Sequence, residues 1–200
     1  DSDTEVLLNS YIQWGVDCLD KLNGMFAFGL YDKRNNKIFI ARDRAGEKPL
    51  FYSINNDSLY FSSELKGLIE IDKSIKQIDK KSLNLYLSVG YIAGESCIYK
   101  NVFKLPAASA LIFDLENGTE NIWRYWKIPN ADIDPKKKSL ECEEDLINEL
   151  DSLLEDSVKR QMVADVPIGV LLSGGVDSSL ITAYAIRNFS NVKTFTVSFE

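Results

Sequence analysis

The chain has 200 residues, 45% of them apolar, which is enough to bury one large hydrophobic core or two small ones. Its 23 basic and 30 acidic residues give a net charge of −7, which opposes the counterion release that drives binding to nucleic acid, so no nucleic-acid partner is expected. No apolar run approaches the roughly 20 residues that cross a bilayer and no signal-like leader opens the chain, so we expect a cytoplasmic protein without a membrane partner.

Histidine is absent from the sequence, which excludes every catalytic or metal-binding arrangement that depends on an imidazole. The three cysteines, Cys18, Cys97 and Cys142, are odd in number and lack the paired spacing of a zinc site or a redox motif. We interpret them as reduced structural thiols. Any chemistry in this chain must therefore use other side chains.

A first helix is predicted from the opening residues. Ser2 and Glu5 have the spacing of a capping box, in which a hydroxyl and a carboxylate cap the first turn. Apolar residues then recur at near-helical spacing until Gly15, where we expect the helix to end.

Alternating and continuous apolar runs next predict an antiparallel sheet built from hairpins. Short polar turns separate the runs, and the branched and aromatic residues within them suit a half-buried pleat. Two short helices are predicted between the second and third hairpins. The strands are expected at 25–31, 38–41, 50–54, 59–61, 108–113 and 121–126, and the helices at 64–69 and 82–87.

A change of composition marks a domain boundary. Residues 128–138 are polar, contain Pro129 and Pro135, and show neither the helical nor the strand period. We therefore predict a first domain over 1–129, a linker over 130–139 and a second domain over 140–200.

The second domain has the pattern of a βαβ unit. Leucines at helical spacing between acidic residues predict an amphipathic helix that runs to about Met162. The apolar run 166–172 predicts a strand buried on both faces. A helix over 180–189 and a last strand over 193–199 are expected to follow it.

The segment between that strand and the next helix carries the strongest chemical signal. Residues 173–179 read Ser-Gly-Gly-Val-Asp-Ser-Ser and follow the carboxyl end of a strand, where open α/β sheets bind ligands. The two glycines allow a tight turn without a Cβ in the way of an anion. The serine hydroxyls, the free amides at the helix start and the helix dipole all favour phosphate. The sequence therefore predicts a phosphate-binding loop.

This loop differs from the two familiar nucleotide-binding loops, because it has neither the Gly-Lys-Ser/Thr ending nor the dinucleotide glycine pattern. Charge on a polyphosphate would then be met by amides, hydroxyls and a metal ion, for which Asp177 is the candidate ligand. On residue chemistry alone, a glycine-rich turn with a serine cap and no ligand is the alternative.

Both halves of the chain resemble one enzyme family. The loop, with the preceding run Asp-Val-Pro-Ile-Gly-Val-Leu-Leu at 165–172, resembles the pyrophosphate loop of asparagine synthetases, within the wider family of ATP pyrophosphatases. Residues 22–28, 41–52 and 62–68 resemble the back half of the class II glutaminase domain that precedes the synthetase domain. The resemblance covers nearly the whole chain and is weakest over 71–101 and through the linker.

The resemblance implies a fold in two parts. The first is the C-terminal part of an α+β antiparallel glutaminase domain of the N-terminal-nucleophile type. The second is the N-terminal part of a parallel α/β nucleotide-binding domain, the ATP-binding synthetase domain.

For glutamine, the resemblance implies that the catalytic N-terminal cysteine precedes Asp1, so no catalytic residue is expected in this chain. Asp3 matches the family aspartate that contacts the α-amino group of glutamine, and a helix cap or first-turn acid is the alternative role for it. Arg42 and Asp43 are expected to form an ion pair that supports the sheet rather than to act in catalysis.

For ATP, the resemblance implies a set of contacts in the second domain. Asp177 is also expected to bind Mg²⁺, together with an aspartate further along the family's sequence. Leu171 and Val197 match positions beside the adenosine, and a place in the hydrophobic core is the alternative for Leu171. The phosphate contacts carried over are Ser173, Gly174, Gly175, Asp177, Ser178 and Ser179.

The reaction implied is that of a glutamine-hydrolysing asparagine synthetase, with glutamine, aspartate and ATP as substrates and Mg²⁺ as cofactor. The aspartate side chain is adenylated with release of pyrophosphate, and ammonia from glutamine then attacks β-aspartyl-AMP. Two alternatives stay open: an amidotransferase that acts on another carboxylic acid in surface-polysaccharide or secondary metabolism, and a non-catalytic nucleotide-binding relative. A homodimer is one expected assembly of the full-length enzyme.

Overall fold

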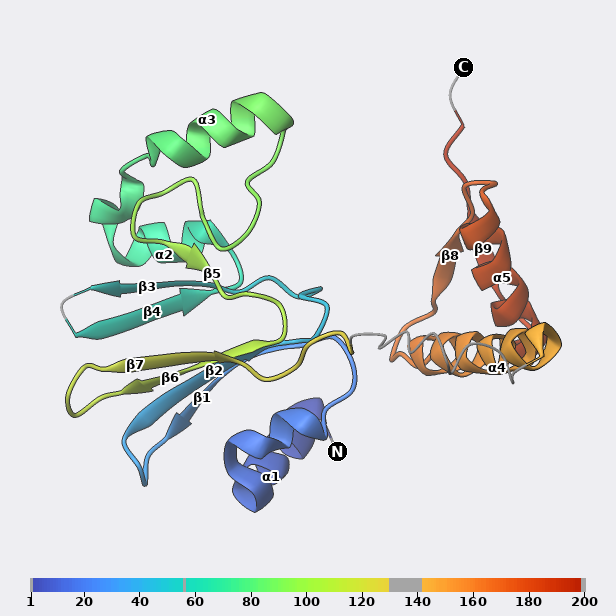
Figure 1. Cartoon of the computed structure of the whole chain (residues 1–200), viewed down its shortest axis with the longest axis horizontal. Helices are drawn as coiled ribbons and strands as arrows, with labels where there is room; N and C mark the ends of the chain where they lie inside the picture. The colour runs from blue at the N-terminus through green and yellow to red at the C-terminus, as the bar shows by residue number, and fades with distance from the viewer. Residues whose placement is uncertain (1, 56, 130–141, 199–200) are drawn as a thin grey trace. The chain divides into compact units, whose positions relative to one another are not determined.

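The structure is a computed structural model that describes residues 2–55, 57–129 and 142–198. The chain separates into two compact units, Asp1–Asn130 and Ala131–Glu200 (Figure 1). The linker predicted at residues 130–139 lies outside the described residues.

Antiparallel strands form two sheets in the first unit, with orders β1-β2-β6-β7 and β4-β3-β5. The three predicted hairpins are confirmed as the pairs β1–β2, β3–β4 and β6–β7. The prediction of one sheet is wrong, because β2 pairs with the distant β6 rather than with β3. The strands are β1 Ala27–Asp32, β2 Lys37–Arg42, β3 Phe51–Asn55, β4 Ser58–Ser62, β5 Phe103–Lys104, β6 Ser109–Asp114 and β7 Glu120–Arg124.

Strand β2 is buried on both faces. Successive side chains of a strand point to opposite sides, and those of β2 enter two different cores. Ile40 packs in a core with Tyr52 of β3 and Leu111 of β6, which joins the two sheets. Its neighbour Phe39 packs in a second core with Leu19, which joins the same sheet to a helical layer. Phe39 and Ile40 are both at most 1% exposed.

Helices cover the outer face of each sheet (Figure 1). Leu68 from one of them is fully buried in a third core, beside Val102 and the partly buried Phe51 of β3. The first unit therefore has four layers in the order helix, sheet, sheet, helix. The helices are α1 Asp3–Trp14, α2 Leu65–Ile71 and α3 Lys80–Val89, with 3-10 turns η1 Gly15–Asp20 and η2 Lys73–Lys76 that the sequence did not predict.

The start and end of α1 agree with the sequence analysis. The Ser2 Oγ accepts a hydrogen bond from the Glu5 backbone N–H at 3.3 Å and so caps the first turn. The helix ends at Gly15, whose φ of 58° is in the left-handed region that favours glycine.

The second unit contains α4 Glu143–Gln161, β8 Gly169–Leu171, α5 Val176–Asn188 and β9 Lys193–Phe195. Strands β8 and β9 are parallel, which confirms the predicted βαβ unit. Helix α5 begins four residues earlier than predicted, so the second half of the glycine loop forms its first turn. None of the helices in the described part of the chain is both long and apolar enough to span a membrane.

The core of the second unit is small. Val158 of α4 packs against Tyr184 and Ala185 of α5, and the Tyr184 hydroxyl donates to Asp151 Oδ1 at 2.8 Å. The prediction that β8 is buried on both faces is wrong for the described residues, since Leu171 is 77% exposed. Val170 of β8 packs against the core that α5 forms with α4, on one face of a sheet of two strands.

Candidate functional site

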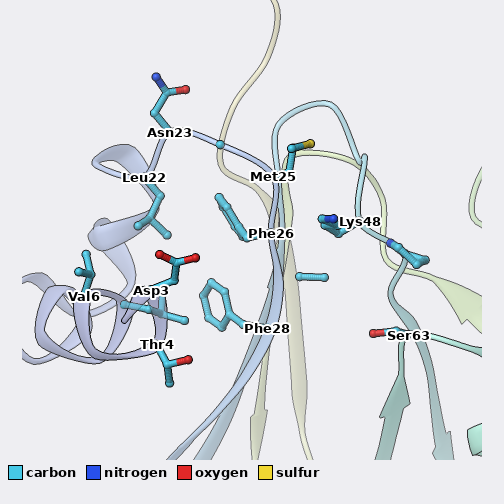
Figure 2. Close-up of a pocket in the computed structure, with 14 residues that line it drawn as sticks. Asp3, Thr4, Val6, Leu22, Asn23, Met25, Phe26, Phe28, Lys48 and Ser63 are labelled. Atoms are coloured by element: carbon cyan, nitrogen blue, oxygen red, sulfur yellow. The ribbon is translucent and has the colours of Figure 1, made fainter. Parts of the chain in front are cut away.

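A cavity of about 780 Å³ lies within the first unit. Its walls come from the first turns of α1, the segment that enters β1 and the segment that enters β3. Apolar side chains predominate, with a carboxylate and an ammonium among them (Figure 2). The lining residues are Asp3, Thr4, Val6, Leu7, Leu22, Asn23, Gly24, Met25, Phe26, Ala27, Phe28, Lys48, Pro49 and Ser63.

Asp3 is the predicted site residue that the structure places at this cavity. It occupies the first position of α1, so the N-cap role belongs to Ser2, whereas the alternative role of a first-turn acid is confirmed for Asp3. Within the described part of the chain, no side chain pairs with the Asp3 carboxylate and no donor hydrogen-bonds to it. A carboxylate with no partner among the described residues, on the wall of a largely apolar cavity, can bind an ammonium group of a ligand.

Asp43 is a buried charge that bonds to residues of the cavity wall, and only 1% of its surface is exposed. Its carboxylate accepts backbone hydrogen bonds from Phe26 at 3.3 Å, Glu47 at 2.9 Å and Lys48 at 3.0 Å. Burial alone raises the pKa of Asp43, but these backbone donors outweigh it and hold the pKa below its ordinary value. Asp43 is therefore ionised at neutral pH.

Arg42 also bonds to backbone groups, so the predicted Arg42–Asp43 ion pair is wrong. Its Nε donates to the Lys48 carbonyl at 2.7 Å, its Nη1 to the Leu105 carbonyl at 2.8 Å and its Nη2 to the Gly46 carbonyl. The physical reason is that the loop between β2 and β3 leaves carbonyl and amide groups without sheet partners. The two charged side chains satisfy those groups instead of each other, so the predicted structural role is kept.

The glycine-rich loop of the second unit connects the end of β8 to the start of α5. Gly174 has a φ of 80°, a conformation that glycine adopts without strain. Gly175 is the N-cap of α5, and no side chain caps the helix there. The first amides of a helix have no partner within it, so these amides are available to an anion.

Three serine hydroxyls shape the loop. Ser178 Oγ accepts from the Ser173 backbone N–H at 3.3 Å and lies 3.0 Å from Ser173 Oγ. Ser178 Oγ and Ser179 Oγ both donate to the Gly175 carbonyl, at 3.1 and 2.8 Å. Ser178 thus ties the start of the loop to the first turn of α5, a shaping role that the sequence analysis did not foresee.

The remaining predicted ATP residues lie around the same loop. Asp177 is exposed in the first turn of α5, and Leu171 and Val197 are 77% and 74% exposed, so Leu171 is not a core residue. Thr196 was missed by the sequence analysis, although its hydroxyl donates to the Leu172 carbonyl at 2.7 Å. This bond and the backbone pairing of β8 with β9 hold the segment before Val197 beside the loop. A polar residue directly after a strand was the only signal.

A magnesium ion would find one protein ligand at the loop. The described residues contain no group of three or more acidic or cysteine side chains that could hold a metal. Asp177 is exposed and supplies the carboxylate oxygen that Mg²⁺ prefers. Mg²⁺ commonly takes its other oxygens from phosphates and water, so a single carboxylate fits this ion when it arrives with a nucleotide.

Comparison with known proteins gives a family match in each unit. Residues 1–126 match the family described as glutamine amidotransferase domain, and residues 149–200 match the family described as asparagine synthase. The whole chain is 42% identical to a putative glutamine-hydrolyzing asparagine synthetase of Methanocaldococcus jannaschii and 38% identical to asparagine synthetase 3 of Bacillus subtilis. Over 93% of its length it is 36% identical to asparagine synthetase B of Escherichia coli. The chain spans 38%, 32% and 28% of these three relatives.

Proposed function

Because the chain belongs to the family of glutamine amidotransferase domains, we propose that its first unit binds glutamine and its second unit binds ATP, within a glutamine-hydrolysing asparagine synthetase. The observation that carries the proposal is that one chain holds both a cavity with an unpaired carboxylate and a loop suited to phosphate. The residues proposed for the glutaminase part are 1–129. Those proposed for the start of a parallel α/β synthetase domain are 140–200.

In the first unit, Asp3 would bind the α-amino group of glutamine. A charge-assisted hydrogen bond to this carboxylate would fix the amino group at a wall that also includes Leu22, Phe26 and Phe28. The cavity volume of about 780 Å³ exceeds what an amino acid fills, so glutamine can enter without a large rearrangement of the walls.

In the second unit, the amides at the start of α5 and the hydroxyls of Ser173, Ser178 and Ser179 would bind the phosphates of ATP. Leu171 and Val197, exposed beside the loop, would contact the adenosine. Asp177 would hold Mg²⁺, which neutralises charge on the departing pyrophosphate. Gly174 and Gly175 bring the backbone close to the phosphates because they carry no Cβ.

The proposed reaction joins the two sites. The β-carboxylate of aspartate attacks the α-phosphorus of ATP, giving β-aspartyl-AMP and pyrophosphate. Ammonia released from glutamine then displaces AMP and forms the amide. The loop contributes to the first step by stabilising the negative charge that develops on the leaving pyrophosphate.

A related amidotransferase with another carboxylic acid as acceptor would use the same two sites. The glutamine and ATP sites proposed here would serve either acceptor. Asparagine synthesis is favoured because the relatives named above carry that activity in their names. We further propose a cytoplasmic location, and a homodimer of the complete enzyme stays a prediction.

The test is pyrophosphate release from ATP by the complete enzyme that contains this chain, with ammonia as nitrogen source and aspartate compared with other carboxylic acids. We expect release that depends on aspartate and that Asp177→Ala lowers by about 10²–10³-fold, the usual cost of losing one charge-stabilising group. Turnover with another acid and none with aspartate would leave the loop assignment in place and reject the acceptor. If no acid supports pyrophosphate release, the proposed synthetase activity is rejected.

A further inference from the structure

Arg42 and Asp43 hold one residue of the cavity wall from both sides of its backbone. Asp43 Oδ2 accepts a hydrogen bond from the Lys48 N–H at 3.0 Å, and Arg42 Nε donates to the Lys48 carbonyl at 2.7 Å. Pro49 follows directly and also lines the cavity. Lys48 is therefore fixed on its N–H and on its carbonyl side by two charged groups, and its backbone has little freedom to move.

The same carboxylate holds a second part of the wall. Asp43 Oδ2 accepts from the Phe26 N–H at 3.3 Å, and the Asp43 N–H donates to the Phe26 carbonyl at 2.9 Å. Phe26 and Lys48 belong to segments that enter different sheets, and both line the cavity that contains Asp3 (Figure 2). One buried carboxylate thus joins two wall segments of the candidate glutamine pocket.

Other aspartates of the first unit bond to backbone amides in a different way. Asp32 accepts from the amides of Arg34 and Asn35, and Asp114 accepts from those of Glu116 and Asn117, all within three residues in their own turns. Those bonds close exposed hairpin turns away from the cavity. Asp43 is buried and reaches Phe26, 17 residues away.

Burying a full charge is unfavourable unless several donors meet it. The structure meets this requirement at Asp43 with three backbone amides, all from Phe26 or from the loop that contains Lys48. A turn that needed only closure is served by a partly exposed aspartate within the turn itself, as Asp114 shows. The buried position therefore suits a residue that sets the spacing of the two wall segments.

We propose that Asp43, assisted by Arg42, is a positioning residue of the glutamine pocket that holds the Phe26 and Lys48 segments at the spacing glutamine requires. The inference rests on the proposed function, because it takes glutamine as the ligand. Neither side chain is proposed to touch glutamine.

The test uses the complete enzyme and measures pyrophosphate release with glutamine and, separately, with ammonia as nitrogen source. Asp43→Asn keeps the side-chain shape but replaces one acceptor oxygen with an amide that faces N–H donors. We expect the KM for glutamine to rise roughly tenfold or more, since small displacements in a site cost at least that much, while the KM for ammonia stays unchanged. The matched control is Asp114→Asn, for which neither KM should change.

A purely structural role would lower both activities in proportion and leave the KM for glutamine unchanged, and that result would overturn the proposal. If Asp43→Asn yields no folded enzyme, Arg42→Lys decides, because it keeps the charge and loses the simultaneous bonds to Lys48, Gly46 and Leu105. A raised KM for glutamine in Arg42→Lys supports the proposal, and an unchanged one rejects it. An unaltered enzyme that never uses glutamine would reject the proposed function, and the positioning role with it.

Discussion

The two candidate sites differ in how the protein holds them. The cavity of the first unit lies within a four-layer structure, and the buried carboxylate of Asp43 bonds directly to its walls. The loop of the second unit is exposed, and serine hydroxyls and the start of α5 give it its shape. A pocket for a whole small molecule therefore depends on walls held in place from several segments, whereas a phosphate site can be made from backbone amides at one helix end.

The largest expected difference between the units is in how much stability a leucine-to-alanine substitution removes. Leu111 is fully buried between the two sheets, whereas Leu171 is 77% exposed beside the loop. Leu111→Ala should lower the free energy of unfolding by about 2–5 kcal/mol, because it removes apolar contacts and leaves a cavity. Leu171→Ala should change it by less than about 0.5 kcal/mol. Denaturant unfolding of the 200-residue chain, followed by circular dichroism, measures both free energies, and similar losses in the two variants would contradict this expectation.

Alanine substitutions at the two glycines of the loop should differ in their effects on stability and on ATP binding. Gly174 has a φ of 80°, so Gly174→Ala should cost roughly 1–2 kcal/mol in the free energy of unfolding. Gly175 has an ordinary φ of −77°, and an added Cβ would meet Ser173 Oγ at 3.6 Å, a normal contact. Gly175→Ala should therefore cost less stability than Gly174→Ala, only the roughly 0.5–1 kcal/mol of a poorer N-cap residue, and should weaken ATP binding.

Binding of ATP by equilibrium titration and thermal unfolding of the same samples check this prediction. The two variants serve as controls for each other, because both add one methyl group to neighbouring positions. Equal ATP affinity for Gly175→Ala and the unaltered enzyme would show that phosphate does not approach the backbone at this loop.

The smallest effect concerns alkaline pH in the first unit. Burial raises the pKa of Tyr125 to about 12, and its hydroxyl donates to the Arg42 carbonyl at 2.8 Å. Because this folded pKa lies above the ordinary value of about 10, the stabilisation is complete below pH 10 and is lost as the pH rises toward 12. Tyr125→Phe should cost about 1 kcal/mol at pH 8, from the lost hydrogen bond.

The same variant should weaken the dependence of stability on pH between 10 and 12. Denaturation midpoints at pH 8, 10 and 11.5 measure it, with Tyr31→Phe as the control, since Tyr31 is 55% exposed. If stability depends on pH between 10 and 12 as steeply in Tyr125→Phe as in the unaltered protein, another group causes the loss of stability at alkaline pH.

Local patterns in the sequence predicted most of the secondary structure, because hairpin turns, capping residues and apolar periods act over a few residues. The pairing of β2 with β6 was not predictable in this way, since it joins residues about 70 positions apart. The start of α5 was misplaced because serine and aspartate suit both a loop and the first turn of a helix.

The same limit applies to the sites. The glycine loop was visible in the sequence because its residues are contiguous. The cavity was not, because Asp3, Phe26 and Lys48 come from separate segments that only the folded unit brings together. Asp43 was expected to pair with its sequence neighbour Arg42, and its backbone partners depend on a loop conformation that periodicity does not describe.

The most direct test of the account compares Asp3→Asn with Asp177→Asn in the complete enzyme, each assayed for amide formation with glutamine and with ammonia. We expect Asp3→Asn to lose activity with glutamine and to keep activity with ammonia, and Asp177→Asn to lose both. If Asp3→Asn left the KM for glutamine unchanged, or Asp177→Asn kept full activity with ammonia, the assignment of one site to each unit would be contradicted.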